Sequence, residues 1–182
     1  MLATPTFAAD FIIVDGQTET TQGVLNGDPN NIGIIEAGGT LTVGAAEDAI
    51  VATGSDNIIT NSGSITGADD GIDSRGDNAI ITNSGSITGD FEGINSIGAK
   101  ATITNSGTIT STSDDGIDSS GDNATITNSG TITGDFDGIY STGDDAIITN
   151  SGIITGGEDD IDSRGDNAII TNSGSITSTT DD

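Results

Sequence analysis

The triplet Asn-Ser-Gly recurs along this chain at an almost constant spacing, and that repeat limits the folds the chain can adopt. The triplet begins at Asn61, Asn83, Asn105, Asn128, Asn150 and Asn172, and a degenerate copy begins at Ala37. Successive triplets are 22 residues apart, with a single interval of 23. A period of this length predicts a solenoid, in which each repeat forms one turn and buries its apolar face by stacking on its neighbours.

Three positions in each repeat carry isoleucine, and the aligned repeats form three columns. The columns are Ile59, Ile81, Ile103, Ile126, Ile148 and Ile170; Ile65, Ile87, Ile109, Ile132, Ile154 and Ile176; and Ile72, Ile94, Ile117, Ile139 and Ile161. The flanking positions accept Thr, Ser, Asp, Asn and Tyr, as outward-facing strand positions do. The pattern predicts an all-β fold, a single-stranded parallel β-helix (β-solenoid) with about 22 residues and three short strands per turn. The usual crossover rule makes it right-handed.

Helical repeats are the alternative, and the turn signals argue against them. Each repeat holds clusters of Gly, Ser, Asn and Asp, and the β-branched runs between them are too short for a useful helix. The asparagine of each triplet continues the inward alternation of Ala79, Ile81 and Asn83. We therefore expect these asparagines to form a hydrogen-bonded amide ladder at one corner of the solenoid.

The pattern divides the chain into three parts. Residues 1–9 are expected to be the remnant of a signal peptide, because Thr6, Phe7 and Ala8, or the following Ala9, offer a small-residue cleavage site. An ordinary flexible N-terminus is the alternative. Residues 10–56 would form an N-terminal cap and first irregular coils, and residues 57–182 the regular 22-residue repeats. The last segment matches residues 109–115, which continue further, so we expect the chain to stop in mid-turn and to be a fragment of a longer solenoid.

Composition argues against several classes of function. The chain has 3 basic and 29 acidic residues, a formal net charge of −26, and nucleic acid is a poor partner because phosphate binding needs Lys and Arg. Cysteine and histidine do not occur, which removes disulfides, thiolate metal sites and the commonest general base. A carboxylate in every turn is repetition and not the unique pair of a glycosidase. We expect no enzyme activity, no cofactor and no direct membrane insertion by this segment.

Arg-Gly-Asp, the tripeptide by which many extracellular ligands engage integrins, occurs twice at the same predicted corner. The copies are Arg75, Gly76 and Asp77, and Arg164, Gly165 and Asp166. The other repeats keep a Ser-x-Gly frame here, in which Gly is expected to supply backbone freedom and Asp to suit a turn. The tripeptides are therefore either turn residues or a receptor-binding site displayed twice.

Acidic residues form a further column, at one position of successive turns. They are Asp70, Glu92, Asp115, Asp137, Asp159 and Asp182. Like charges directly opposite one another destabilise a sheet, and calcium, which takes oxygen ligands, would relieve the repulsion. The first five residues make a candidate calcium ladder. The alternative is a solvated acidic face, screened by water and salt.

The positions that flank the second isoleucine column form a Thr/Ser face. One flank is Thr66, Thr88, Thr110, Thr133, Thr155 and Thr177, and the other is Ser64, Ser86, Thr108, Thr131, Ile153 and Ser175. A flat Thr-x-Thr array of this kind resembles the ice-binding faces of antifreeze proteins. Threonine is also a common outward strand residue, so an ordinary solenoid wall is the alternative.

The repeats also resemble a known family. The sequence Ala-Thr-Ile-Thr-Asn-Ser-Gly-Thr-Ile-Thr at 101–110 and 124–133 is similar to the repeats of autotransporter passenger domains of Gram-negative bacteria. Residues 8–27, leading into 36–44, resemble the region that follows their signal peptide. The resemblance implies export through an outer-membrane β-barrel, expected elsewhere in the full protein, and folding on the cell surface.

On these grounds we expect an extracellular, non-catalytic passenger-type protein that acts in cell-surface adhesion, autoaggregation or biofilm formation. Repeated acidic and Thr/Ser faces would make weak contacts with host-cell, matrix or self surfaces, and their avidity would accumulate. An exposed solenoid end would also allow end-to-end self-association. The alternatives are a structural spacer or surface-layer component without a ligand, and an ice-binding protein.

Overall fold

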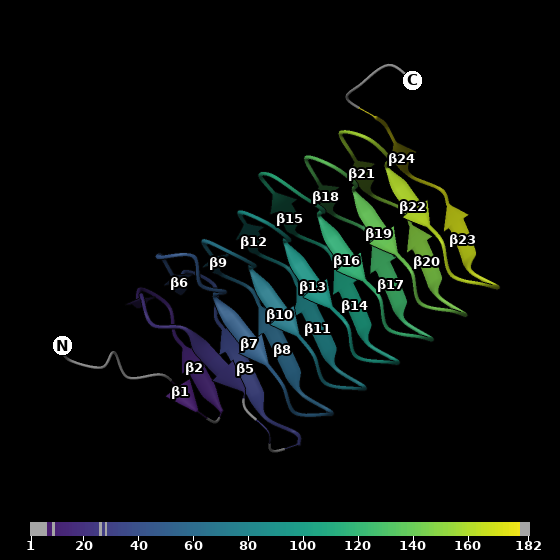
Figure 1. Cartoon of the computed structure of the whole chain (residues 1–182). Coiled ribbons are helices and arrows are strands. Elements are labelled where there is room, and N and C mark those ends of the chain that lie inside the picture. The colour runs from purple at the N-terminus through teal and green to yellow at the C-terminus, as the bar shows by residue number, and fades with distance from the viewer. Residues whose placement is uncertain (1–6, 9, 26, 28, 179–182) are drawn as a thin grey trace.

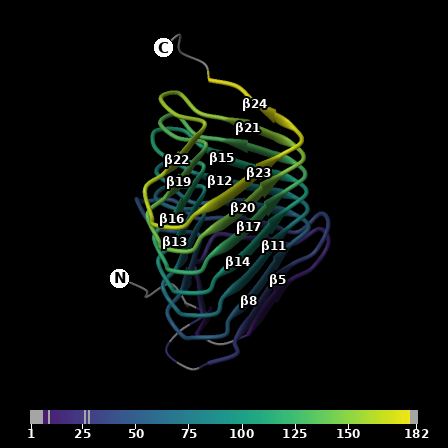
Figure 2. The same ribbon diagram turned by 90° about the vertical axis from the view of Figure 1, so that its right-hand side faces the viewer.

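The chain winds into a β-solenoid. The computed structural model describes residues 7–8, 10–25, 27 and 29–178, and all regular structure within them is β-strand. The strands form three parallel sheets of eight strands each, one strand from each sheet per turn (Figure 1). Figure 2 shows the turns stacked on one another around a narrow interior. The predicted β-solenoid is confirmed, and the described residues contain no helix that could span a membrane.

We name the sheets A, B and C. Sheet A holds β1 (Phe7–Ala8), β4 (Gly23–Leu25), β7 (Ile50–Ala52), β10 (Ile72–Ser74), β13 (Ile94–Ser96), β16 (Ile117–Ser119), β19 (Ile139–Ser141) and β22 (Ile161–Ser163). Sheet B holds β2 (Phe11–Ile13), β5 (Ile32–Ile35), β8 (Ile58–Asn61), β11 (Ile80–Asn83), β14 (Thr102–Asn105), β17 (Thr125–Asn128), β20 (Ile147–Asn150) and β23 (Ile169–Asn172). Sheet C holds β3 (Thr18–Glu19), β6 (Thr40–Thr42), β9 (Ser64–Thr66), β12 (Ser86–Gly89), β15 (Thr108–Ser111), β18 (Thr131–Thr133), β21 (Ile153–Thr155) and β24 (Ser175–Ile176).

The three isoleucine columns lie in register inside the solenoid, one against each sheet. Ile81 pairs with Ile59 below it and with Ile103 above it, and the other two columns repeat this arrangement. From β8 to β21 the column isoleucines are at most 1% exposed. Burying an isoleucine side chain contributes about 1.5–3 kcal/mol, so these columns form the core.

The asparagine ladder is present at the corner between sheets B and C. The Nδ2 of Asn83 donates to the Oδ1 of Asn105 over 2.8 Å, and the same bond links every neighbouring pair from Asn61 to Asn172. Each of these oxygens also accepts a backbone N–H two residues further on, as Asn83 does from Gly85. The buried amides therefore satisfy both themselves and the corner backbone.

The glycine of the Ser-x-Gly corner, between sheets A and B, has a different role from the one predicted. The positive φ at this corner belongs to Asn78 (58°) and its equivalents, such as Lys100 (60°), and not to Gly76. A Cβ on Gly76 would lie 1.8 Å from the carbonyl oxygen of Gly54 in the turn below. Glycine is required here because stacked corners pass too close for a side chain.

The first coils depart from the regular 22-residue period. Gly33 of β5 pairs with Ile59 of β8, 26 residues further on, whereas later partners in sheet B are 22 or 23 apart. The Phe11 side chain fills this end of the core, and a Cβ on Gly23 or Gly33 would lie 2.8 Å from its ring. Of the predicted signal-peptide remnant only Phe7 and Ala8 are described, as β1, and Asp182 also lies outside the described residues.

Substitution of Ile109, at the centre of the second column, tests whether the isoleucine columns account for the free energy of unfolding. Ile109→Ala should lower the free energy of unfolding by about 2–5 kcal/mol, because the stacked turns cannot close the cavity. Its outward neighbour supplies the control, and Thr110→Ala should change the same quantity by less than about 1 kcal/mol. Urea denaturation followed by circular dichroism measures both. Equal effects of the two substitutions would contradict the column as the core.

Candidate functional site

Charge divides the surface of the regular turns into two sides. Six ten-residue windows contain no charged residue: 57–66, 79–88, 101–110, 124–133, 146–155 and 168–177. They cover sheet B, the Asn-Ser-Gly corner and sheet C, which we call the charge-free side. Between residues 57 and 178, every acidic and basic residue lies on sheet A or on one of the two corners that flank it, which we call the acidic side. The two sides therefore suit partners of different chemistry.

On the acidic side, the five residues of the predicted calcium ladder lie in successive turns at the corner before sheet A. Three of the five, Asp70, Asp115 and Asp137, each have one carboxylate oxygen engaged by the backbone. The Oδ1 of Asp115 accepts the N–H of Asp137 over 2.9 Å, and the Oδ1 of Asp137 accepts the N–H of Asp159 over 3.0 Å. The Oδ1 of Asp70 accepts the N–H of Glu92 in the same way over 3.1 Å. These carboxylates therefore have a structural role, because they accept backbone N–H groups from the corner of the next turn.

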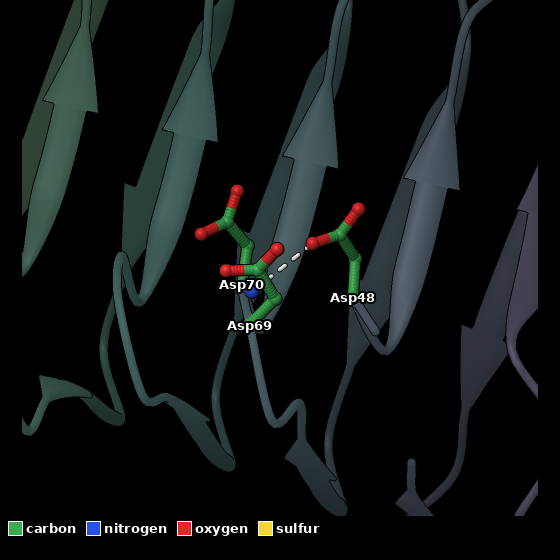
Figure 3. A group of neighbouring side chains, drawn as sticks. All are labelled: Asp48, Asp69 and Asp70. Carbon is green, nitrogen blue, oxygen red and sulfur yellow. Dashed lines mark hydrogen bonds between the residues drawn. The ribbon is translucent and has the colours of Figure 1, made fainter. Parts of the chain in front are cut away.

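Two carboxylates that the sequence interpretation missed lie beside this column. Asp48 continues it one turn below Asp70, whose N–H it accepts over 3.1 Å, and Asp69 precedes Asp70 in the chain. One carboxylate oxygen from each of the three residues lies within 4.8 Å of the other two, and Figure 3 shows the three side chains close together. Aligning Glu47-Asp48-Ala49-Ile50 with Asp69-Asp70-Gly71-Ile72 would have identified Asp48.

Crowding raises the affinity of this side for protons. Loss of hydration, with repulsion from nearby carboxylates, raises the pKa of Asp48 to about 6, of Asp115 to about 7 and of Asp118 to about 6. Burial and a hydrogen bond to Asp70 raise the pKa of Glu92 to about 9. The surroundings of these carboxyl groups disfavour their negative charge. Binding of protons or of cations to them therefore stabilises the folded chain.

The neighbouring outward column on sheet A leaves acceptors available. The Oδ1 atoms of Asn95 and Asp118 are buried and have no hydrogen-bond partner among the described residues. The Nδ2 of Asn95 donates to the Oδ2 of Asp70 over 3.3 Å, which links this column to the corner carboxylates. Oxygen atoms of this kind are the ligands that calcium takes. The calcium site remains a prediction, and its centre is the group of carboxylates formed by Asp48, Asp69 and Asp70.

The two Arg-Gly-Asp tripeptides are built into the corner between sheets A and B. The Nε of Arg75 donates to the Oδ2 of Asp73 over 2.6 Å, and the Oδ1 of Asp77 accepts the N–H of Ala99 over 2.9 Å. Arg75 therefore turns back over sheet A, away from Asp77. All three residues of this copy thus have a structural task, since Gly76 allows the close stacking described above.

The second copy repeats the arginine and glycine contacts of the first. The Nε of Arg164 donates to the Oδ2 of Asp162 over 2.7 Å, and its guanidinium lies 5.1 Å from the centre of the Tyr140 ring. Gly165 stacks on Gly143 as Gly76 does on Gly54. The N–H of Asp166 donates to the Oδ1 of Asp144 over 2.8 Å. Both arginines are paired within the chain, which favours the turn interpretation over the receptor-binding one.

The charge-free side carries two ordered arrays, and the sequence interpretation found one of them. The predicted Thr/Ser face lies on sheet C, where Thr88 pairs in register with Thr66 and Thr110. The outward face of sheet B carries a second array of isoleucine and threonine, with Thr82 in register with Thr60 and Thr104. The sequence prediction covered only the buried alternation of Ala79, Ile81 and Asn83, and the outward residues between them form the second array.

Comparisons with known proteins assign no relative to this chain. No family model matches it, and neither the search of curated proteins nor the search of solved structures found a match.

The acidic side predicts an unusual pH dependence, in which the free energy of unfolding falls as pH rises from about 4 to about 7. The pKa values of Asp48, Asp115 and Asp118 are about 6, 7 and 6 in the folded chain against an ordinary value of 3.8. The folded state therefore binds more protons than the unfolded state across this window, and its stability declines as those protons leave. Urea denaturation at constant ionic strength measures the slope.

Asp118→Asn is the matched variant, because Asn95 occupies the equivalent position one turn below. It should make the slope shallower and raise the stability at pH 7. A chain whose stability increases between pH 4 and pH 7 would contradict the raised pKa values.

Calcium is expected to raise the melting temperature at millimolar concentration, because an ion that binds only the folded state stabilises it by mass action. Asp69→Asn should remove the increase, since it takes a carboxylate from the cluster with Asp48 and Asp70. Asp159→Asn changes an exposed member of the column outside that cluster and should retain it. An increase matched by sodium chloride of equal ionic strength would indicate screening alone.

Proposed function

We propose that this chain is a non-catalytic, exported surface protein that acts in adhesion, as a stiff rod with repeated binding faces. The division of its surface carries the proposal. Each turn adds the same charge-free and acidic elements, about 4.8 Å above the last, so a weak contact made by one turn is repeated by its neighbours. Contacts repeated in this way accumulate avidity without any single strong site.

The composition of the two sides supports adhesion over catalysis. The charge-free side carries hydroxyl and methyl groups in register, and the acidic side carries carboxylates in every turn. A catalytic site needs one constellation that differs from its surroundings, whereas both sides repeat. An autotransporter-like passenger on the cell surface is the setting that the repeat sequence resembles, and adhesion, autoaggregation and biofilm formation are the roles we propose for it there.

The alternatives differ in what they require of these sides. A spacer or surface-layer component needs the stiffness of the rod and no ligand. Ice binding needs the Thr/Ser face of sheet C, where Thr66, Thr88 and Thr110 lie in register. Thermal hysteresis of the purified chain distinguishes ice binding from both adhesion and the spacer role.

Beads coated with the chain test adhesion directly. They should bind to cell monolayers, to immobilised matrix and to one another more than beads coated with albumin do, and binding should grow steeply with coating density because it depends on avidity. Binding no greater than that of the albumin beads would favour the spacer.

The same assay separates the two interpretations of Arg-Gly-Asp. Asp77→Ala combined with Asp166→Ala should leave cell binding within about twofold, because the arginines are paired within the chain and Asp77 binds the backbone of the next turn. Asp122→Ala is the matched control, since Asp122 accepts the N–H of Asp144 at the same corner of a repeat without arginine. Loss of binding in the double variant alone would establish the tripeptides as a receptor site.

A further inference from the structure

The outward face of sheet B, which we call the sheet B face, carries two ranks of side chains in register. The first rank is Ile58, Ile80, Thr102, Thr125, Ile147 and Ile169, and the second is Thr60, Thr82, Thr104, Thr127, Thr149 and Thr171. The four isoleucines are 37%, 44%, 42% and 58% exposed in chain order. The isoleucines form two exposed pairs, separated by Thr102 and Thr125, and large exposed aliphatic side chains gathered on one wall indicate a contact surface.

The order of the first rank is the second observation. Over the six turns from β8 to β23 it runs Ile, Ile, Thr, Thr, Ile, Ile, which is the same in both directions. Ile32 of β5 continues the rank below Ile58 and lies outside this self-matching stretch. A two-fold axis makes a surface meet itself, with position i of one copy facing position j of the other and j facing i. The stretch of the rank from β8 to β23, which is its own mirror image along the solenoid axis, satisfies that condition.

We propose that the sheet B face is a self-association surface, on which a second copy of this chain packs with its turns stacked in the opposite direction. The two-fold axis runs parallel to the strands, between β14 and β17. Ile80 of one copy then faces Ile147 of the other, and Thr102 faces Thr125. The second ranks face each other as threonine on threonine.

In this orientation isoleucine faces isoleucine and threonine faces threonine. The other two-fold arrangement that brings the two sheet B faces together does not give these pairs. A two-fold axis along the solenoid would keep the turns of the two copies in the same direction. It would also place the first rank of each copy over the second rank of its partner, so that exposed isoleucines would face threonine hydroxyls. Apolar area is buried most completely when isoleucine meets isoleucine.

Charge identifies a second copy as the occupant. With a net charge of −26, two copies repel wherever their acidic sides meet, and the charge-free side is where they can approach. The corner acids beside sheet B, such as Asp77 and Asp144, lie outside the facing sheets, which pack about 10 Å apart. That separation exceeds the Debye length of about 8 Å at physiological salt. Near the two-fold axis, Lys100 lies opposite Asn123 of the other copy, which is the residue next to Asp122.

Sheet C, the other wall of the charge-free side, lacks this symmetry. Its first outward rank runs Ser, Ser, Thr, Thr, Ile, Ser from Ser64 to Ser175. The same operation would place Ile153 over Ser86, and only two of the three facing pairs would match. The self-complementary order therefore belongs to sheet B and is not a general result of the repeat.

The size of the sheet B face predicts a weak pair. Six strands of four residues cover roughly 400 Å² on each copy from the strand dimensions, about half the area of a standard interface on each partner. Isolated chains should therefore pair only at high concentration. Many chains on facing surfaces would pair with avidity, and chains that project from two facing cells meet in opposite directions. That last role rests on the proposed function, whereas the pairing does not.

The absence of cysteine from the chain allows a direct test by single-site cross-linking of the full chain. Ile80→Cys and Ile147→Cys variants are mixed at high concentration with a bismaleimide whose span is near the sheet-packing distance of about 10 Å. The mixture should give a covalent heterodimer. Each variant alone should give at least about fivefold less, because its own cysteines lie three turns, or about 14 Å, apart along the axis.

Matched cysteines on sheet C are the control. Thr88→Cys and Thr155→Cys lie in the same turns as Ile80 and Ile147 and should give no excess of heterodimer. Equal yields from the two walls, or no product from either, would overturn the proposal and leave the sheet B face to another partner. Efficient cross-linking of Ile80→Cys to itself would overturn the antiparallel arrangement.

Charge insertion provides an independent measurement. Thr104→Asp with Thr127→Asp should weaken pairing at least about tenfold in sedimentation equilibrium, because it places unpaired carboxylates between the facing sheets. Thr110→Asp with Thr133→Asp on sheet C is the control and should leave pairing unchanged. Circular dichroism and thermal melts confirm that each variant folds. Pairing that survives the sheet B substitutions would overturn the proposal.

The bead assay keeps the two proposals separable. Beads carrying Thr104→Asp with Thr127→Asp should lose most bead-to-bead binding and retain binding to matrix. If bead-to-bead binding is unchanged while the chain still adheres, self-association through sheet B fails and the adhesive function stands. If chains pair in solution and their beads adhere to nothing, the adhesive function fails and the pairing stands.

Discussion

The stacking of each turn on the next, at a single fixed spacing, is the constraint on which the rest of this structure depends. An isoleucine such as Ile109 is fully buried only because Ile87 and Ile132 lie directly below and above it. The backbone ladders of the three sheets require the same spacing at every corner. The corners then admit only residues that tolerate close passage, which is why glycine and a buried asparagine recur there.

Because the turns stack in register, a residue type that recurs at one position of the repeat forms a column along the solenoid. A carboxylate placed once per repeat becomes a row of carboxylates, and on the acidic side that row is tolerated because many of its members accept a backbone N–H from the next turn. The cost is visible in the raised pKa values of Asp115 and Glu92. The same rule makes the charge-free side continuous, since a window without charge in one repeat becomes a whole wall without charge. Both proposed activities follow from walls of this kind and not from a pocket.

Much of this was accessible from sequence because period and position carry the information. The isoleucine columns, the parallel register and the asparagine ladder all follow from a 22-residue spacing and a two-residue alternation. The candidate site was predicted less well. Asp48 was missed because residues 10–56 were predicted to form irregular coils, although it lies 22 residues before Asp70. Gly76 was given a conformational role when the reason for glycine is the carbonyl of Gly54 in the turn below.

By itself, then, the sequence determined the fold, because a strict repeat with three inward isoleucines per period admits one way of burying them. It also determined that charge would be confined to one side, since the charge-free windows coincide with two of the three strands. Only the tertiary structure decided how neighbouring turns meet: which carboxylate accepts which N–H, and that Arg75 pairs with Asp73 and turns away from Asp77. These depend on distances between residues some 22 positions apart, and a one-dimensional pattern specifies such neighbours without specifying the direction in which their side chains point.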